Sequence, residues 1–518
     1  MKRILLKFLI STILFSGIFT STAFALNIDY VVGSDRYETA SIIASNMDYS
    51  SAILVNGLSI VDGLSASGLS GTLNAPILLT QKNNIPSSTL ARLTQANTIY
   101  IVGGNGVVST DIEKYLQNMN KSVVRLGGSD RYETSISVAN KIESLKGIQE
   151  IYYVNGLTGT ADAMSIAPVA ASNSNPVILT DGKSTSYKQN VKSYSIGGYG
   201  VVNSSFDLFS ERINGIDRFE TNKNVINKFF PNKNHVNLSK SDILIDALTA
   251  SALKEPVVLI SDNSDKTSIA GAKSATVFGN ISQTAVNRAK SYIYGDKVVF
   301  YTQHQDDETL FAGSAIIDAI ESVGRENVHV VLITDGSGSE VFNWPRYVNN
   351  TISTNIALRT NEFNASLLKL GVDLTNVTYL NQPENNIDYG SLIDTVNYFE
   401  NTYRDVTHVV HSYKYDTHAQ HLKSGQIIYD LYNNGVVKDA RFFTTSEYVS
   451  KLSRNLLIES ISDTVEEKER VLSAAYEYKL DNKDMTREGI GYKSVGRLFN
   501  ILTSDPKVTS YLHEPEVK

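Results

Sequence analysis

Short apolar segments rich in β-branched residues alternate with amphipathic stretches along residues 28–292. AILVN (52–56), PILLT (76–80) and TIYIV (98–102) are examples of the first kind, and TDIEKYLQNM (110–119) is an example of the second. Short continuous apolar runs are typical of strands buried on both faces, and regular alternation of strands with helices favours a parallel sheet covered by helices. The pattern therefore predicts an α/β fold.

The same order of landmarks occurs three times. GSDRYET is found at 33–39 and again at 128–134, and GIDRFET follows at 215–221. Each copy continues with a related VNG or VNL segment and then with a strand of the type PILLT, PVILT or PVVLI. A repeat this long, with its own strands and helices, indicates three small domains and not the turns of a solenoid.

The DRYET segment predicts the start of a helix in each copy. Its aspartate stands at the N-cap and its glutamate three positions later, which is the spacing of a reciprocal capping box. These pairs are Asp35 with Glu38, Asp130 with Glu133, and Asp217 with Glu220.

The arginine of the same segment falls in the first helical turn, where a cation gains nothing from the helix dipole. We expect each arginine to face a carboxylate of its own unit. The candidate pairs are Arg36 with Asp62, Arg131 with Asp162, and Arg218 with Asp246. The spacing is compatible both with structural ion pairs and with arginines that face an anionic glycan.

These landmarks resemble the cell-wall-binding repeat 2 modules of clostridial surface-layer proteins. The resemblance places the repeats at 28–118, 119–208 and 209–292. It implies three Rossmann-like modules in a pseudo-threefold array. It also implies non-covalent attachment to an anionic polysaccharide of the cell wall.

The N-terminus predicts secretion. Basic residues at Lys2, Arg3 and Lys7 precede an apolar run and then STAFA, so we interpret 1–25 as a signal peptide cleaved after Ala25. The run is short and interrupted, and we expect no membrane span after cleavage. Without this segment, 44 of the 47 basic residues remain, against 54 acidic ones, so the formal charge is −10. This negative charge argues against nucleic-acid binding.

The chain contains no cysteine, so no disulfide supports its fold outside the cell. This composition suits a bacterium with a single membrane. Together with the repeats, it predicts a secreted protein in the cell wall or surface layer of a Gram-positive bacterium.

The histidines are concentrated in the other half of the chain. Seven of the eight follow residue 300. We interpret His408 and His411, which lie on the apolar segment THVVH, as structural residues of a strand. His418 and His421 differ, because residues three apart share one face of a helix.

An acidic cluster in TQHQDDETLFAG (302–313) follows the apolar run VVFY. Adjacent like charges repel, and a bound cation would remove that cost. Imidazole and carboxylate ligands suit zinc, which keeps three protein ligands in catalytic sites. His304, Asp307 and His421 would form such a set at the carboxyl end of a strand, where open α/β sheets bind ligands.

Three segments resemble the PIG-L (LmbE-like) deacetylases. TQHQDDETLFAG is similar to their AHPDDExxxxGG signature, DTHAQHLKSG (416–425) to their HPDH segment, and ALRTNEFNASLLKLGV (357–372) to their RxxExxxAxxxLGV helix. The similarity covers about 295–440. It implies a Rossmann-like α/β deacetylase domain, which we place at 295–518.

The resemblance also implies a role for individual residues. It makes His304, Asp307 and His421 ligands of Zn²⁺ or another divalent metal, Asp306 the general base, His418 the group that stabilises the oxyanion or protonates the leaving amine, and Arg359 a substrate-orienting residue. Glu308 receives no role.

Two positions depart from the family pattern. Gln305 replaces a proline, which costs loop rigidity and little chemistry. Gln420 replaces an aspartate expected to support a protonated His418, and because glutamine supplies no charge, we expect weaker activity or a shifted pH optimum. Asp416 is close enough in sequence to compensate.

The resulting hypothesis is a cell-wall-anchored, metal-dependent hydrolase that removes N-acetyl groups from N-acetylglucosamine-containing glycans. The main alternative is a non-catalytic surface-layer protein whose deacetylase-like domain only binds glycan, and Gln420 favours that alternative. A third possibility is a metal-dependent hydrolase of another amide.

Overall fold

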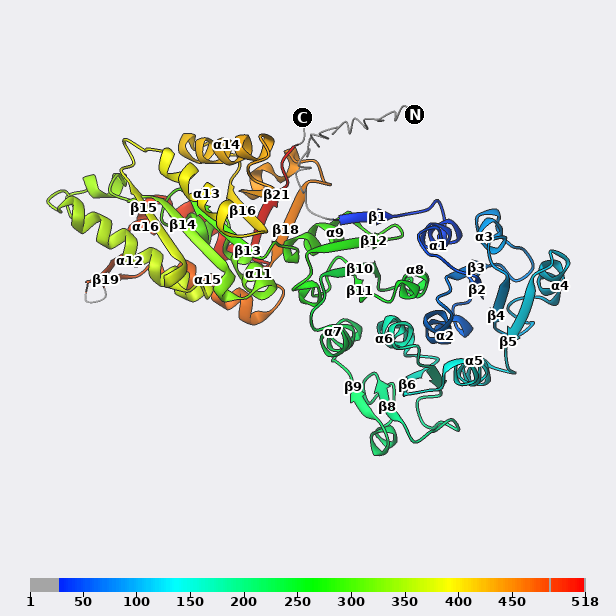
Figure 1. The fold of residues 1–518 in the computed structure, drawn as a ribbon. Coiled ribbons are helices and arrows are strands. Elements are labelled where there is room, and N and C mark those ends of the chain that lie inside the picture. The colour runs from blue at the N-terminus through cyan, green and yellow to red at the C-terminus, as the bar shows by residue number, and fades with distance from the viewer. Residues whose placement is uncertain (1–27, 484–485, 517–518) are drawn as a thin grey trace, which may run out of the picture.

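The protein is described here by a computed structural model of residues 28–483 and 486–516; the predicted signal peptide 1–25 lies outside them. The described chain contains three four-stranded sheets, one seven-stranded sheet and a short hairpin, with helices between the strands (Figure 1). This arrangement confirms the α/β class. None of the helices in these residues has the length and apolar character needed to cross a membrane.

The first unit has a parallel sheet of order β3-β2-β4-β5. Its strands are β2 (Ser51–Asn56), β3 (Ile77–Thr80), β4 (Thr98–Val102) and β5 (Ser122–Leu126), and its helices are α1 (Arg36–Ser45), α2 (Ala66–Leu73), α3 (Ser87–Leu93) and α4 (Thr110–Asn118). Strands β2 and β3 are buried almost throughout, as their apolar runs predict.

The second and third units repeat this plan, with orders β7-β6-β8-β9 and β1-β12-β10-β11. The second contains α5 (Arg131–Lys146), β6 (Glu150–Asn155), α6 (Thr160–Asn173), β7 (Val177–Thr180), β8 (Lys192–Ile196) and β9 (Glu211–Ile213). The third contains β1 (Ile28–Val31), α7 (Arg218–Phe229), β10 (His235–Lys240), α8 (Ile245–Ala250), β11 (Val257–Ile260), β12 (Ser274–Phe278) and α9 (Gln283–Ala289).

The units interlock through their edge strands. β5 and β9 complete the first and second sheets although they lie beyond the predicted ends of those repeats, at 118 and 208. β1, the first strand of the described chain, pairs in parallel with β12, so that the third sheet is completed from the beginning of the first repeat. The three units therefore close into the predicted pseudo-threefold array.

Helices α2, α6 and α8 lie between the three sheets (Figure 1). A Cβ atom at Gly71 of α2 would lie 1.8 Å from the carbonyl oxygen of Ala171 in α6, so only glycine permits this approach. Ser67 of α2 and Ser251, which follows α8, share a hydrogen bond of 2.9 Å.

The DRYET segments start their helices as predicted, but with a different second contact. The Asp35 carboxylate accepts a hydrogen bond from the Glu38 N–H at 2.8 Å. Glu38 accepts from the N–H of Ser34, one residue before the N-cap, at 2.7 Å. The same shift occurs at Glu133 and Glu220, so the reciprocal contact extends the cap by one residue.

The arginines of these segments have other partners than those predicted. Each donates to a backbone carbonyl of its own unit, as Arg36 does to Gly57 at 2.6 Å; Arg131 and Arg218 bind the carbonyls of Gly156 and Ser241.

The carboxylates each lie in the field of a neighbouring unit's arginine: Asp62 with Arg131, Asp162 with Arg218, and Asp246 with Arg36. Burial raises the pKa of Asp162 to about 7, although Arg218 opposes this shift. The predicted pairing of each carboxylate with the arginine of its own unit is wrong. The array places each unit next to the following one and the third unit next to the first, so each carboxylate lies nearer to the next unit's arginine.

The C-terminal domain has a sheet of order β15-β14-β13-β16-β17-β21-β18, parallel except for β21. Its strands are β13 (Lys297–Thr302), β14 (Val328–Thr334), β15 (Val377–Gln382), β16 (Val406–His411), β17 (Asp439–Thr444), β18 (Leu457–Ile461) and β21 (Thr509–His513). Its helices are α10 (Asp307–Leu310), α11 (Gly313–Val323), α12 (Ile352–Leu370), α13 (Gly390–Thr402), α14 (Ala419–Asn433), α15 (Val465–Glu477) and α16 (Ile490–Ser504), and the hairpin is β19 (Asp481–Asn482) with β20 (Arg487–Glu488).

Both faces of this sheet are covered. Val298 and Phe300 of β13 pack with α11, α12 and α15, and Val299 and Tyr301 pack with α13 and α14. The alternation of these buried residues explains why VVFY reads as a continuous apolar run. The end of the chain, whose fold the sequence does not predict, forms α16 and inserts β21 into the sheet.

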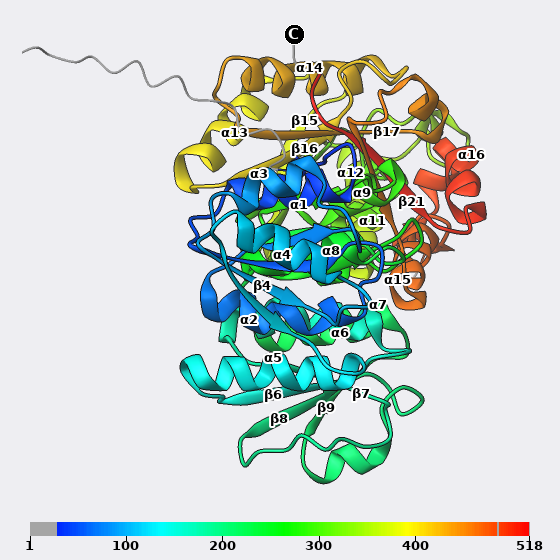
Figure 2. The same cartoon turned by 90° about the vertical axis from the view of Figure 1, so that its right-hand side faces the viewer.

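The third unit contacts the C-terminal domain. The first unit lies on the side of the third unit away from that domain (Figure 1), and the second unit lies at the bottom in Figure 2, opposite α13 and α14. Arg288 of α9 forms a buried ion pair with Asp463, and Lys290 pairs with Glu514. Arg441 of β17 also donates to the carbonyl oxygen of Ile293. These buried charges fix the two parts against each other.

Candidate metal centre and active-site cavity

The candidate site lies at the carboxyl ends of β13 and β16. The chain runs from β13 to β14 and β15 on one side and then returns to β16 on the other, so the strand order switches between β13 and β16. Ligands of open α/β sheets bind at such switch points. His304 follows β13, and His421 lies in α14, the helix that follows β16.

The three predicted metal ligands come together in space. The Nδ1 atom of His304 lies 3.1 Å from Nε2 of His421 and 3.6 Å from Oδ2 of Asp307, and the last two atoms are 3.5 Å apart. In a tetrahedral zinc site with bonds of about 2.0–2.2 Å, ligand atoms are about 3.3–3.6 Å apart. The triangle has the size that such an ion requires.

Hydrogen bonds on the outer side orient both histidine rings. Gln420 donates through Nε2 to the carbonyl of Glu384, so its Oε1 accepts from His304 Nε2 at 2.7 Å. The Asp416 carboxylate accepts from His421 Nδ1 at 3.0 Å. The protons are therefore held on the outer nitrogens, and the inner nitrogens keep their lone pairs for a cation.

This geometry changes the interpretation of Gln420. The sequence led us to expect that residue 420 supports His418, and the structure places Gln420 against His304. The amide oxygen of a glutamine can accept the His304 proton, as a carboxylate would, and so fix the same tautomer. It does not add the negative charge of a carboxylate. Asp416 supplies its charge to His421 and caps the backbone N–H of His418.

His411 contributes to the site, which the sequence interpretation missed. It is fully buried at the end of β16, and its Nε2 lies 2.9 Å from Oδ2 of Asp307. Burial alone would lower the pKa of His411, but the carboxylates of Asp307 and Asp416 outweigh it and raise that pKa. The sequence shows that His411 ends an apolar segment, which could have indicated a site residue. That inference also requires the strand order, which places β16 beside β13.

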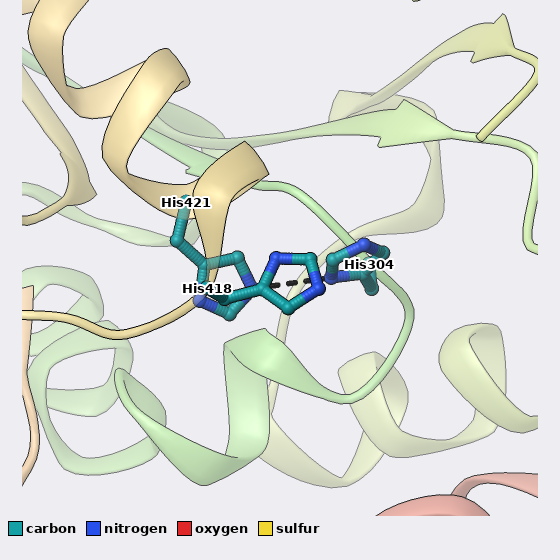
Figure 3. Close-up of side chains that lie close together, drawn as sticks. All are labelled: His304, His418 and His421. Carbon is teal, nitrogen blue, oxygen red and sulfur yellow. Dashed lines mark hydrogen bonds between the residues drawn. The ribbon is translucent and has the colours of Figure 1, made fainter. Parts of the chain in front are cut away.

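Within residues 28–483 and 486–516, two overlapping sets of side chains could hold a cation: His304, His418 and His421, and Asp307, His411 and His421. His421 belongs to both. Figure 3 shows how the rings of His304, His418 and His421 face one another, from the loop after β13 and the start of α14. The set predicted from the sequence takes its members from both groups.

Asp306 has an unusual backbone conformation. Its φ of 124° is in a region that residues with a side chain rarely adopt. Oδ2 accepts from Arg359 Nη2 at 2.9 Å, and the Asp306 N–H donates to Glu308 at 3.1 Å. Burial raises the pKa of Asp306 to about 7, with Arg359 opposing and Asp307 adding to the shift.

Glu308, for which the sequence suggests no role, supports this loop. Its buried Oε1 accepts hydrogen bonds from Thr309, Ser366 and Tyr478, at 2.7, 2.8 and 2.8 Å. Its other oxygen holds the N–H of Asp306. Glu308 is therefore a buried anchor of the strained turn and not part of the metal set.

Arg359 is buried beside Asp306. Its guanidinium bonds Asp306, Glu362 and the carbonyl oxygen of Gln305. The structure thus brings the predicted substrate-orienting residue against the predicted base. A direct contact of Arg359 with substrate stays a prediction.

These groups open into a cavity of about 700 Å³, within the range of small-molecule sites. His304, Asp306, His418 and His421 are among the residues that line it. Glu384 also lines the cavity, and burial raises its pKa.

Fold and site define a modular α/β protein: three interlocked Rossmann-like units joined to a Rossmann-like domain with a histidine and carboxylate centre. The chain belongs to the family described as cell wall binding domain 2, whose model matches residues 31–113, 125–207 and 212–305, half of the chain. A second model, for GlcNAc-PI de-N-acetylase, matches 299–432. Both resemblances inferred from the sequence are confirmed.

Three known proteins illustrate the similarity. N-acetylmuramoyl-L-alanine amidase LytC of Bacillus subtilis is 28% identical over 338 residues, 59% of this chain and 67% of LytC. The amidase enhancer of the same organism is 30% identical over 270 residues, 48% of this chain and 36% of the enhancer. Cwp8 from Clostridium difficile aligns with a TM-score of 0.49 and 28% identity, over 52% of each chain.

The chain thus spans between about a third and two thirds of the length of these curated relatives. The family matches identify a cell-wall-associated protein with wall-binding repeats and a deacetylase-like domain.

Proposed function

We propose that this protein is a metal-dependent deacetylase of the cell wall, which hydrolyses the N-acetyl groups of N-acetylglucosamine-containing glycans. The observation that supports this proposal most directly is the triangle formed by His304 Nδ1, Asp307 Oδ2 and His421 Nε2 beside the buried carboxylate of Asp306. The triangle opens into a cavity large enough for a sugar.

The residues fit a divalent cation such as Zn²⁺. His304 and His421 would hold it through nitrogens whose ring partners already carry the protons, and Asp307 through Oδ2. When bound, the ion supplies Lewis acidity, which makes an amide carbonyl more electrophilic and a water molecule more acidic. The carboxylate of Asp307 is oriented for this by His411.

Asp306 is the proposed general base. It takes one proton from the attacking water, whose oxygen forms a bond to the acetamide carbonyl carbon. Arg359 holds Oδ2 of Asp306 and sets the orientation of the carboxylate. A folded-state pKa near 7 would let the group both accept and release a proton near neutral pH.

His418 is the proposed partner for the developing charge. It lines the cavity at the N-terminus of α14, where an oxyanion can receive a hydrogen bond. When the carbon–nitrogen bond breaks, the amine takes up a proton, and acetate and a glucosamine-type product leave. His418 is placed to give the amine this proton.

The wall-binding half supplies the location in this proposal. We propose a signal peptide at 1–25, wall-binding repeats at 28–118, 119–208 and 209–292, and a deacetylase domain at 295–518. The repeats would attach the secreted protein to an anionic wall polysaccharide, and the acetylated glycans of the wall would then be its substrate. Binding of the full chain to purified walls, lost when the anionic polymer is stripped, would support the anchoring role; unchanged binding would exclude it.

The alternative of a glycan-binding protein without activity was based on Gln420. That residue has a defined hydrogen bond to His304, so its identity no longer favours the alternative.

Acetate release from an N-acetylglucosamine oligomer tests the activity. The full chain with added zinc should release acetate, and Asp306→Asn should lower the rate about a hundredfold or more, within the range attributed to acid–base groups. Asp394→Asn, on an exposed part of α13, is the matched control and should retain the rate. The proposal fails if the wild-type chain releases no acetate, or if Asp306→Asn is as fast as the control.

A further inference from the structure

A second cleft lies where the third unit meets the C-terminal domain, and we call it the interdomain cleft. It has a volume of about 510 Å³. The third unit contributes α7, the loop after it and the short 3₁₀ helix Thr267–Ile269, and the C-terminal domain contributes α11 and the first turns of α15. Within the described parts of the chain, no residue lines both this cleft and the active-site cavity. Junctions between domains are common places for ligand sites.

The two walls of the interdomain cleft differ in charge. Lys223 of α7 and Lys233 of the following loop lie on the wall of the third unit. Glu321 of α11 and Glu466 of α15 lie on the wall of the C-terminal domain. Glu321 is in the field of Lys223, yet among the described residues no ion pair joins these lysines to these glutamates. The opposite charges therefore face a shared space that a ligand of complementary charge can occupy.

Lys233 has no partner of its own. In the part of the chain that the structure describes, its ammonium group forms no hydrogen bond or ion pair, although the residue is half-buried. Burial lowers the pKa of Lys233, because it takes water away from the charged form. Lys223 has only a long contact of 3.4 Å to Asp265, which does not line the cleft. Both lysines are therefore available to an anionic group of a ligand.

The acidic wall also has free charged groups. Glu321 and Glu466 are exposed, and within residues 28–483 and 486–516 their carboxylates form no hydrogen bond or ion pair. Two other charged residues of this wall are already engaged. Glu467 accepts from two backbone N–H groups at the N-terminus of α15, and Arg470 donates to a backbone carbonyl oxygen. The cleft therefore offers free cations on one side and free anions on the other.

This distribution of charge selects the class of ligand. A polyanion would be repelled by the glutamates, and a polyamine would be repelled by the lysines. Pro231 and Ala270 are the apolar lining residues, so a lipid tail would bury little apolar surface. Asn227 and Thr267 add side chains that can hydrogen-bond a peptide backbone. A short peptide that carries both signs of charge meets all these conditions.

We propose that the interdomain cleft binds a short peptide that has both free carboxylate and free ammonium groups. Lys233 and Lys223 pair with a carboxylate of the peptide, and Glu466 and Glu321 pair with an ammonium group. The bound peptide then joins the two walls and links the wall-binding units to the C-terminal domain. The cleft is separate from the metal centre, so this inference goes beyond the proposed function and does not depend on it.

A titration of the full-length chain, followed through the NMR signals of the peptide at low salt, tests the inference. The probe is the tetrapeptide Ala-Glu-Lys-Ala with free termini. One comparison form has both amines acetylated and is purely anionic, and the other has both carboxyl groups amidated and is purely cationic. The unmodified peptide should bind about fivefold more tightly than either form, because each form loses the ion pairs to one wall.

Two substitutions and their matched controls locate the binding. Lys233→Met should lower the affinity for the unmodified peptide about tenfold, because a charged hydrogen-bond donor on a half-buried residue is lost. Glu466→Gln, at an exposed position, should lower it about threefold. The controls are Lys114→Met on α4 and Glu469→Gln on α15, at exposed positions that do not line the cleft. Both controls should keep the wild-type affinity.

The outcomes separate this inference from the proposed function. No saturable binding at millimolar peptide, equal affinity for the three peptide forms, or cleft variants that behave like their controls would overturn the peptide site. If the wild-type chain releases no acetate but binds the unmodified peptide, and Lys233→Met loses that binding, then the hydrolytic function is wrong and the peptide site stands. Acetate release without peptide binding would give the opposite result.

Discussion

Removal of the Gln420 side chain should weaken metal binding without disturbing the fold. Gln420 Oε1 accepts from Nε2 of His304 at 2.7 Å, and its own amide is held by the carbonyl of Glu384 at 2.8 Å. In Gln420→Ala, the His304 ring can turn or exchange its tautomer, so that Nδ1 no longer keeps its lone pair directed at the cation. The metal ligands themselves are untouched.

The size of this effect follows from the kind of contact that is lost. Substitution of an outer hydrogen-bond partner of a ligating histidine typically costs 10- to 100-fold in metal affinity, or about 1.4–2.8 kcal/mol. We expect zinc affinity, measured by competition with a fluorescent chelator, to fall within this range in Gln420→Ala. Gln420→Glu should retain or increase the affinity, because a carboxylate can accept the same proton and adds negative charge.

Gln426 provides the matched control. It lies on the same helix, and its exposed side-chain amide donates to the nearby Asp430 at 2.8 Å, so Gln426→Ala should leave zinc affinity within about twofold. If Gln420→Ala binds zinc as tightly as Gln426→Ala does, then the proposed orientation of His304 is wrong. If Gln420→Ala changes only the pH dependence of turnover, the original interpretation through His418 would be restored.

Three further predictions concern stability. Burial lowers the pKa of His513 to about 4 from its ordinary 6.5, so its contribution to the free energy of unfolding is complete above pH 6.5 and falls, by up to about 3 kcal/mol, as the pH drops toward 4. The melting temperature of the wild type should therefore fall more between pH 7 and 5 than that of His513→Gln. Equal falls in melting temperature would contradict this. Tyr478→Phe leaves Glu308 short of one buried donor and should cost about 1–3 kcal/mol in urea unfolding; no change would show that Glu308 does not anchor the turn. Gly71→Ala forces a methyl group against the Ala171 carbonyl and should destabilise the repeat array by about 1–3 kcal/mol, and a wild-type melting temperature would refute the close helix approach.

Much of the candidate site was accessible from the sequence, because its members stand in compact motifs. His304, Asp306 and Asp307 lie within four residues, and His418 and His421 share one helical turn. A turn after a buried strand can direct its side chains to only one end of the sheet. The motifs therefore indicated which groups meet, and the structure brings them within a few ångströms.

Other parts of the site could not be predicted in this way. His411 is recognisable as a site residue only when β16 is known to lie beside β13. Thr445 and Ile501 reach one cavity because β21 inserts between β17 and β18 and carries α16 with it. No local pattern contains this strand order.

The sequence by itself determined the α/β class, the threefold repeat, the two families and the chemical types of the groups that meet at the candidate site. Periodicity, capping and motif spacing are local properties, and they act over a few residues. Only the tertiary structure decided that β1 completes the third sheet, that each repeat carboxylate faces the arginine of the next unit, and that Gln420 orients His304. Each of these contacts joins residues distant in sequence, so it depends on how the units and strands pack and not on the residues that flank it.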